Sequence, residues 1–460
     1  PAAASAVTTG FLRDLIAAGH LPPEMSYLAS DPSKLVRARK VAMGGAKDKD
    51  RENQKQIVGL GYDGRRDRHT RAMVEDGHGK KKMRMITEEH ESVTEEPSGK
   101  YLGHFAPEPP VGREKPAMKV AQGLLNILEQ NSSTNSLMFL AGDSTNMNTG
   151  WKGGTHALLE ELLGRRLYWG ICILHTNELP LRHLIILLDG PTCSDKGFTG
   201  EVCSLLSKVH EMPYDPEFRA LPGGEELIIL TEAVLAKMST DQCQCYKLVK
   251  AVKEGRLPKE MQEMMCGPLC HARWLTTGQR LVYMWTRKHG LTGQALRTLE
   301  VLVKFCLTYY FKLYFDMKVK HYISDAPYHI LTSLRLLKTQ PKKVRDSITY
   351  YVRTGAWYAH PECLLVSLLA SSDLQDRQFA VDQILSLRGV EEFGDNRVRP
   401  RITPKLNLSA ASLTKLISWK KGEVQEPSFT CALSSAEIRG FLTTPYTPPK
   451  FSCHTQSTER

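Results

Sequence analysis

Two aspartates stand where short apolar runs give way to glycine and polar residues. Residues 57–70 read IVGLGYDGRRDRHT and residues 137–150 read LMFLAGDSTNMNTG, so Asp63 and Asp143 end the two runs. This pattern is typical of buried strands that carry a carboxylate at their C-terminal edge. If the strands are neighbours, the paired carboxylates form a site suited to Mg²⁺ or Mn²⁺. An aspartate at a strand end can also simply cap a turn or helix, and that alternative stays open.

The segments around these aspartates predict the layers that would hold them. We expect a hairpin over residues 82–105, with its turn at residues 96–99, and then a helix that begins at Pro116. The strand of Asp143, a helix from about residue 155 and a strand over residues 167–174 follow. This order predicts an α/β fold in which the first and fourth strands are parallel neighbours. It is the order of an RNase H-like mixed sheet with flanking helices.

Helical patterns replace alternation beyond about residue 211, as in GGEELIILTEAVLAKMS and QALRTLEVLVKFCLTYYFKLYF. We therefore expect an all-helical insertion domain that interrupts the core. The predicted divisions are an N-terminal helix and basic linker (1–56), the first part of the core (57–210), the insertion (211–345), the closing helices of the core (346–392), and a Pro-rich tail that is extended or disordered (393–460).

The composition narrows the class of protein. The 460 residues carry a net charge of +11, and the basic residues are clustered, which suits a polyanionic partner such as DNA. A solvated basic face would give the same composition. No apolar run is long enough to cross a membrane, and the 11 cysteines do not form the spacing of a secreted disulfide framework. We expect a soluble intracellular protein.

Four segments together resemble the hobo/Activator-type (hAT) DNA transposases, whose RNase H-like core is interrupted by a helical insertion. The resemblance spans roughly residues 57–390. It rests on GYDG at Asp63, GDSTNMNTG at Asp143, the CxxH segment from Cys172 to His175 with NELPLRHL after it, and the RW-type segment HARWLTT at residues 271–277.

The resemblance implies a metal-dependent transposase in which Asp63 and Asp143 are two of three acidic ligands for Mg²⁺ or Mn²⁺. The third acid should follow the insertion, and our candidate is Glu362, because Pro361 favours a helix start there. The alternative for Glu362 is that it only complements a helix dipole. Glu391 and Glu392 are the other candidates for the third acid.

The other site residues follow from the same resemblance. Trp274 would stack on a flipped base and Arg273 would hold phosphate, whereas the plain alternative is a core tryptophan beside a solvated arginine. Arg65 and Arg66 would also contact DNA. Cys172 and His175 would support the active site. A zinc site is the alternative for this pair, but a single CxxH is half a site, and no spacing rule recruits Cys266, Cys270 or His271.

The implied function is cleavage and strand transfer at transposon ends and target DNA, in the nucleus, and a homo-oligomer is the open alternative to a monomer. One alternative is a domesticated, catalytically inactive DNA- or protein-binding protein. A second is an RNase H-like nuclease. The BED-type zinc finger that usually opens the family has no counterpart before residue 57. Either this sequence is a fragment that lacks the finger, or the protein has lost it, and loss would put sequence-specific recognition of transposon ends in doubt.

Overall fold

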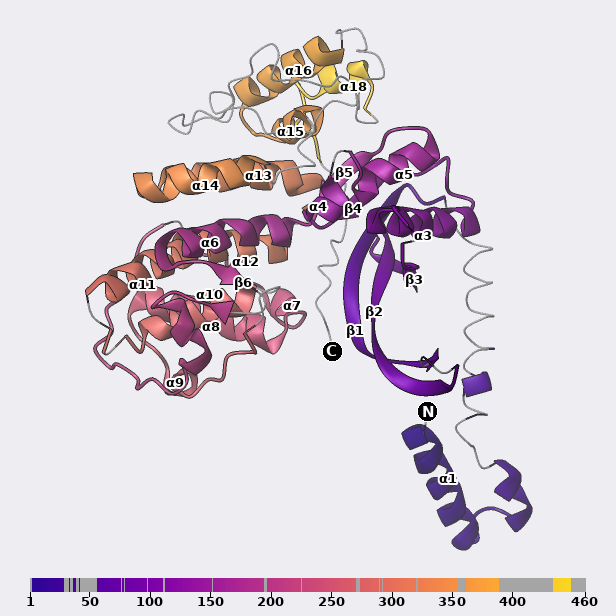
Figure 1. Cartoon of the computed structure of the whole chain (residues 1–460). Helices are drawn as coiled ribbons and strands as arrows, with labels where there is room; N and C mark the ends of the chain where they lie inside the picture. Colours follow the sequence, from indigo (N-terminus) through magenta and orange to yellow (C-terminus); the bar gives the residue numbers. More distant parts are fainter. Residues whose placement is uncertain are drawn as a thin grey trace. The chain divides into compact units, whose positions relative to one another are not determined.

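The computed structural model (Figure 1) describes residues 2–28, 33, 36–38, 41, 56–75, 77, 79–96, 98–110, 112–150, 152–193, 197–224, 226–269, 274–288, 290–291, 293–319, 322–354, 361–388 and 433–447. Within these ranges it does not describe the side chains at 2–6, 8, 27–28, 68–69, 193, 322–328, 353–354, 361–364 and 387–388. The chain forms two compact units. One comprises Pro1–Ile57 and Leu128–Ser133, and the other comprises Val58–Ile127 and Thr134–Arg460. The first unit contains the expected N-terminal helix, α1 (Ala2–Ala17), and a 3₁₀ turn, η1 (Pro23–Leu28).

The second unit contains a five-stranded mixed sheet in the order β3-β2-β1-β4-β5. Its strands are β1 (Gly59–Glu75), β2 (Lys81–Glu96), β3 (Lys100–Phe105), β4 (Phe139–Gly142) and β5 (Tyr168–Ile171). β1 is antiparallel to β2 and parallel to β4, while β2 and β3 form the expected hairpin. The prediction of an α/β protein whose first and fourth strands are parallel neighbours is therefore confirmed.

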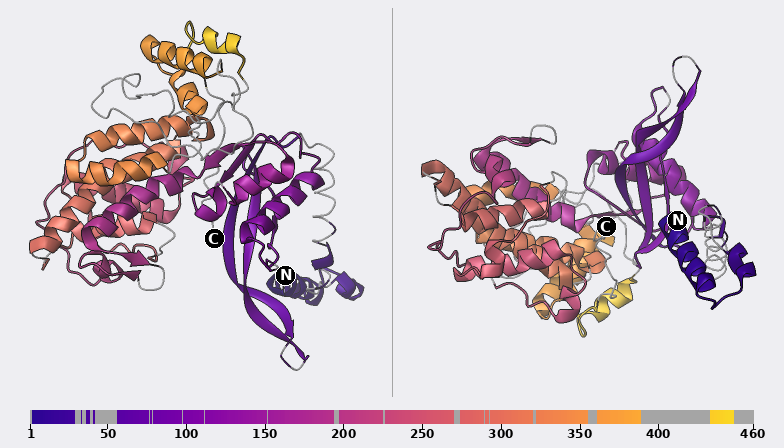
Figure 2. Two further views of the ribbon diagram at one scale, coloured as in Figure 1. Left: turned by 45° about the horizontal axis from the view of Figure 1, so that its top comes forward. Right: turned by 90° about the horizontal axis from the view of Figure 1, so that it is seen from below.

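The first strand is much longer than the sequence pattern indicated. It does not end near Asp63 but continues to Glu75, paired with β2, with a register shift between Asp67 and Thr70. The parallel pairing with β4 ends at Gly61. Beyond it the strand is no longer covered on both faces, so it needs no run of apolar side chains. Figure 2 shows this two-stranded extension projecting from the sheet.

Two helices pack on one face of the sheet. Alternation along the strands puts Tyr62 of β1 on the same face as Val93 of β2, and both are buried. The ring of His156, on α5 (Thr155–Leu163), lies 5.7 Å from the Tyr62 ring. The other helix, α3 (Pro116–Gln130), approaches through Gly123, where an added Cβ would lie 2.1 Å from the Phe105 ring of β3. The short helix α4 (Asn146–Thr149) joins β4 to α5.

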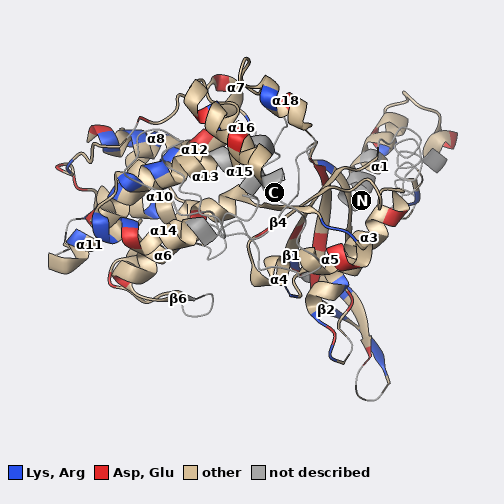
Figure 3. Cartoon of the chain, turned by 90° about the horizontal axis from the view of Figure 1, so that it is seen from above, with Lys and Arg blue, Asp and Glu red and all other residues tan. Residues whose placement is uncertain are grey.

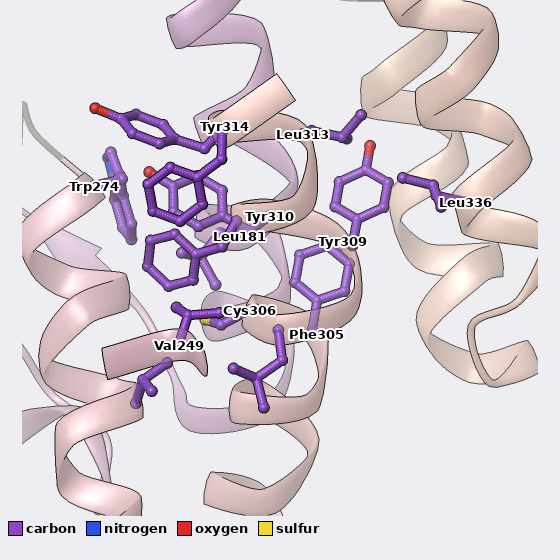
Figure 4. Close-up of a cluster of buried hydrophobic side chains, with 14 of the residues drawn as sticks. Leu181, Val249, Trp274, Phe305, Cys306, Tyr309, Tyr310, Leu313, Tyr314 and Leu336 are labelled. Carbon is purple, nitrogen blue, oxygen red and sulfur yellow. The ribbon is translucent and has the colours of Figure 1, made fainter. Parts of the chain in front are cut away.

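The chain beyond β5 is mainly helical. Its elements are α6 (Ile173–Asp189), β6 (Thr192–Cys193), β7 (Gly197–Phe198), η2 (Cys203–Lys208), α7 (Glu232–Leu235), α8 (Thr240–Glu254), α9 (Lys259–Gln262), α10 (Trp274–Trp285), α11 (Gly293–Phe305), η3 (Cys306–Tyr310), α12 (Phe311–Val319), α13 (Tyr322–Lys338), α14 (Lys342–Thr354), α15 (Pro361–Leu368), α16 (Leu374–Arg388) and α18 (Ser435–Gly440). The central helix α11–η3–α12 contains one π-helical stretch, and its aromatic side chains fill the core shown in Figure 4.

One predicted helical stretch is not a helix. Apart from residue 225, which lies outside the described residues, residues 223–231 are irregular, and α7 begins only at Glu232. Gly223 and Gly224 have φ angles of 124° and 69°, a conformation that interrupts a helix before it can start. Leu230 is buried while Ile229 is 84% exposed, so the apolar run does not form a helical stripe.

Part of the tail is folded, contrary to the expectation of an extended or disordered segment. Residues 433–447 contain α18, which starts with a capping box between Ser434 and Glu437 and buries Ile438 completely. The Arg377 guanidinium of α16 donates to the Phe441 carbonyl at 2.8 Å. The remainder of the predicted tail lies outside the described residues.

Candidate functional site

The structure places Asp63 and Asp143 at one edge of the sheet. The last parallel pair between β1 and β4 joins Gly61 to Ala141, and each aspartate lies two residues further along its strand. Because side chains alternate with a period of two, the two aspartates start from the same face at adjacent positions. Asp63 is exposed and Asp143 is half-buried. The two aspartates are therefore on neighbouring strands, as predicted, but only Asp143 follows the end of its strand, whereas Asp63 lies within β1.

Asp143 also performs the capping role that was its alternative. Its Oδ1 accepts hydrogen bonds from the Thr145 amide at 2.9 Å, the Thr145 hydroxyl at 2.6 Å and the Asn148 amide at 2.8 Å. These three donors fix the carboxylate at the start of α4. All three bonds fall on Oδ1, so the cap does not use Oδ2. Capping and cation binding are therefore compatible roles for Asp143.

Glu91 is a third carboxyl group at this edge, and sequence reasoning missed it. It lies on β2 opposite Gly64 and is only 5% exposed. An added Cβ at Gly64 would lie 2.9 Å from Glu91 Oε1, so the side chain fits because that position is glycine. Glu91 Oε2 is buried without a hydrogen-bond partner in the described part of the chain. The signal in the sequence was a glutamate two residues before Val93, on the inward face of an alternating strand.

Burial and neighbouring charge raise the pKa of Glu91 into the neutral range, so the group is about half protonated at pH 7. Desolvation first, and then the charges of Asp63 and Asp143, raise the pKa of Glu91 to about 7. The shift indicates that all three carboxyl groups interact electrostatically. A protonated Glu91 can lie beside two carboxylates without adding a third negative charge.

Cys172 and His175 also lie near this edge. The Cys172 amide donates to the Gly142 carbonyl at 2.9 Å, and α6 begins at the next residue. Cys172 is accessible to solvent, but burial of its thiol raises the thiol pKa to about 11. The negative charges of Glu178 and Asp63 make smaller contributions in the same direction. Desolvation lowers the pKa of His175, and the charge of Asp143 opposes that shift. A protonated thiol and a neutral imidazole are groups that can support a site without carrying charge.

The metal ligands predicted from sequence are only partly described. Among the described residues no group of three or more His, Cys, Asp or Glu side chains is arranged to hold a metal ion. Glu362 lies in the first turn of α15, which begins at Pro361 as predicted, but its side chain is outside the described set. Glu391 and Glu392 also lie outside the described residues. The two aspartates supply oxygen donors of the right kind, and the third ligand stays a prediction.

The predicted DNA-contacting residues fall into two groups. Trp274 begins α10 and is 5% exposed, with its ring packed edge-on against Phe198 at 6.1 Å. Figure 4 shows Trp274 among the buried side chains. This is the position of a core tryptophan, so stacking on a base stays a prediction that requires the ring to become exposed. Arg65 and Arg66 are exposed on β1, where Arg66 Nε lies 2.8 Å from Glu89 Oε1.

Three residues of the HARWLTT region cannot be placed. Arg273 lies outside the described residues, as do Cys270 and His271, the possible additional zinc ligands. Cys266 is described, and it is a buried thiol whose pKa burial raises to about 12. Zinc binds the thiolate form of cysteine, so this environment does not favour a zinc site at Cys266.

Comparison with known proteins does not assign the chain to a family. No protein-family model matches the sequence, and no curated protein matches it. In the described part of the chain, no helix is both long and apolar enough to span a bilayer.

Proposed function

We propose that this protein is a transposase, or derives from one, and that it cleaves and joins DNA strands at an RNase H-like core. The observation that carries the proposal is that Asp63 and Asp143 each lie two residues beyond the last parallel pair of β1 and β4, neighbouring strands of a mixed sheet. Further support comes from the order β3-β2-β1-β4-β5, in which only β2 runs against its neighbours β1 and β3. The helices α7 to α13 fall within the bounds proposed for the insertion domain, residues 211–345.

In this proposal Mg²⁺ or Mn²⁺ is held by Asp63 and Asp143 with Glu362 as the third acid. Such ions activate water or a 3′-hydroxyl and stabilise the leaving oxygen of a phosphodiester. The chain's own contribution is orientation: Thr145 and Asn148 fix the Asp143 carboxylate through Oδ1.

Other groups would hold and shape the substrate. Arg65 and Arg66, exposed beyond Asp63 on the same strand, would hold the phosphate backbone, with Arg273 on the insertion side. Trp274 would stack on a flipped base. Cys172 and His175 would complete the wall of the site without adding charge. The partners proposed are transposon ends, target DNA and a second copy of the chain, and the proposed location is the nucleus.

The second candidate function is DNA or protein binding without catalysis, as in a domesticated transposase. It is favoured by one observation: Trp274, which the resemblance assigns to base stacking, is only 5% exposed and packs against Phe198. The two candidates agree on the fold and on the basic surface. They differ only in whether a third acid completes the site.

The test is cleavage of generic and terminal-repeat DNA duplexes by the purified chain with Mn²⁺. We expect cleavage by the wild type and none by Asp63→Asn or Asp143→Asn, because an amide is a weaker cation ligand than a carboxylate. Asp67→Asn is the matched control, because Asp67 lies four residues beyond Asp63 on β1, further from Asp143, and its substitution should leave cleavage intact. Cleavage retained in Asp143→Asn would remove that residue from the site. Binding without cleavage in every variant would favour the second candidate.

A further inference from the structure

The two-stranded extension of the sheet is a separate structural feature, which we call the arm and define as residues 65–90. Its strands are residues 65–75 of β1 and 81–90 of β2, which pair with each other. Pairing of β1 with β4 ends at Gly61, and pairing of β2 with β3 involves Glu91–Glu95. The arm therefore projects as a ribbon without a third described strand (Figure 2). An isolated two-stranded ribbon is marginally stable in water, which makes a binding partner the natural explanation for its length.

The arm carries a net positive charge. It contains eight Lys or Arg residues and five Asp or Glu residues, a net charge of +3 within a chain of +11. The basic residues whose side chains are described are all exposed: Arg65, Arg66, Arg71, Lys80, Lys81, Lys82 and Arg84. They are visible along the arm in Figure 3. This concentration of charge on a narrow projection favours a polyanion as the partner.

One face of the arm is also apolar. The register places Met73 opposite Met83, and Met85 opposite Arg71, so alternation puts the three methionines on the same face. Met73 is 56% exposed, Met83 is 62% exposed and Met85 is 54% exposed. Methionine side chains are flexible and adapt to irregular surfaces, and exposed apolar patches commonly mark binding sites. The opposite face carries Lys82 and Arg84.

We propose that the arm binds in a groove of duplex DNA, with its basic side chains on the phosphates and its methionine face against the groove. A two-stranded β-ribbon fits the major groove of B-DNA. At about 3.3 Å per residue, the 11 residues of β1 in the arm span about 36 Å, roughly one turn of B-DNA. A second copy of the chain is a poor occupant, because two arms of +3 repel each other. The choice of DNA as the polyanion rests on the proposed function.

The test measures DNA affinity of the full chain against salt concentration, by fluorescence anisotropy on a labelled duplex. The variant Lys81→Gln/Lys82→Gln/Arg84→Gln removes three arm charges. The matched control, Lys342→Gln/Lys343→Gln/Arg345→Gln, removes three charges from α14. Each lost phosphate contact lowers the slope of log affinity against log salt by about 0.9. The wild type should therefore lose about 40-fold more affinity than the arm variant between roughly 50 and 200 mM salt.

The control should keep the wild-type slope. The inference is overturned if the arm variant also keeps the wild-type slope. It is also overturned if the slope of the control falls as much as that of the arm variant. The variant Met73→Ser/Met83→Ser/Met85→Ser should weaken binding without changing the slope. If it instead dissociates an oligomer and leaves DNA affinity unchanged, the arm binds a second copy and the inference is wrong.

The experiments distinguish failure of the arm inference from failure of the proposed function. The arm inference stands, and the catalytic proposal fails, if the salt slope of the arm variant is reduced as expected while no form of the chain cleaves DNA. The arm inference alone fails if cleavage depends on Asp143 but the arm variant keeps the wild-type slope.

Discussion

Replacing Glu91 with glutamine should make the protein more stable at alkaline pH and leave it unchanged at acid pH. The pKa of Glu91 is about 7 in the folded protein, against an ordinary value of 4.5. Between these values the folded state keeps a proton that the unfolded state has lost, so stability falls as pH rises through this window and stays low above it. A difference of about 2.5 pKa units corresponds to roughly 3 kcal/mol.

Glu91→Gln removes this penalty, because glutamine has nearly the same shape and does not ionise. We expect the free energy of unfolding at about pH 8 to exceed that of the wild type by up to roughly 3 kcal/mol, and the two to coincide at about pH 4.5. Urea unfolding followed by tryptophan fluorescence at both pH values measures the difference. The pKa of Glu96 is also raised to about 7, but Glu96 is present in both proteins and cancels in the comparison.

Glu89→Gln is the matched control on the same strand. Glu89 is exposed and its ion pair with Arg66 is at the surface, so its loss should change stability by less than about 1 kcal/mol at either pH. The reasoning about Glu91 is refuted if Glu91→Gln is no more stable than the wild type at pH 8, or if the gain is the same at both pH values.

Two further predictions concern the elements that position the site. Asp143→Ala should destabilise the protein by about 1–2 kcal/mol in urea unfolding, because the Thr145 amide loses its acceptor, whereas Asp143→Asn keeps Oδ1 and should cost less. Gly123→Ala should lower the thermal midpoint at a cost of about 1–3 kcal/mol, because the new Cβ would lie 2.1 Å from Phe105. Gly10→Ala in α1, with nothing within 4 Å of the new Cβ, should instead favour its helix by up to about 1 kcal/mol, and a similar loss in both variants would contradict the steric argument.

The sequence predicted the sheet well where local signals agreed. The alternation after Lys81, the turn at residues 96–99 and Pro116 at a helix start correspond to the β2–β3 hairpin and to α3. The parallel pairing of β1 and β4 followed from the order of the elements. These features depend on short-range patterns, which a single sequence displays directly.

Features that depend on distant partners were missed. The arm lacks an apolar run because its strands are exposed, so the end of the hydrophobic pattern at Asp63 was mistaken for the end of the strand. Glu91 was overlooked because its neighbours Asp63 and Asp143 come from other strands. Capping by Asp143 and burial of Trp274 both agree with the plainer alternatives stated for these residues. The roles of Glu362 and Arg273 stay predictions.

The folded segment at residues 433–447 determines where the chain can be shortened. Arg377 is 7% exposed and donates to the carbonyls of Ser371, Ser372, Phe441 and Leu442. A chain ended at the predicted boundary, residue 392, would remove two of these acceptors and leave a buried cation with too few partners. It would also uncover the Leu369 carbonyl that the Tyr446 amide caps at 2.9 Å. Fragments for expression or crystallisation should therefore retain the chain through at least residue 447.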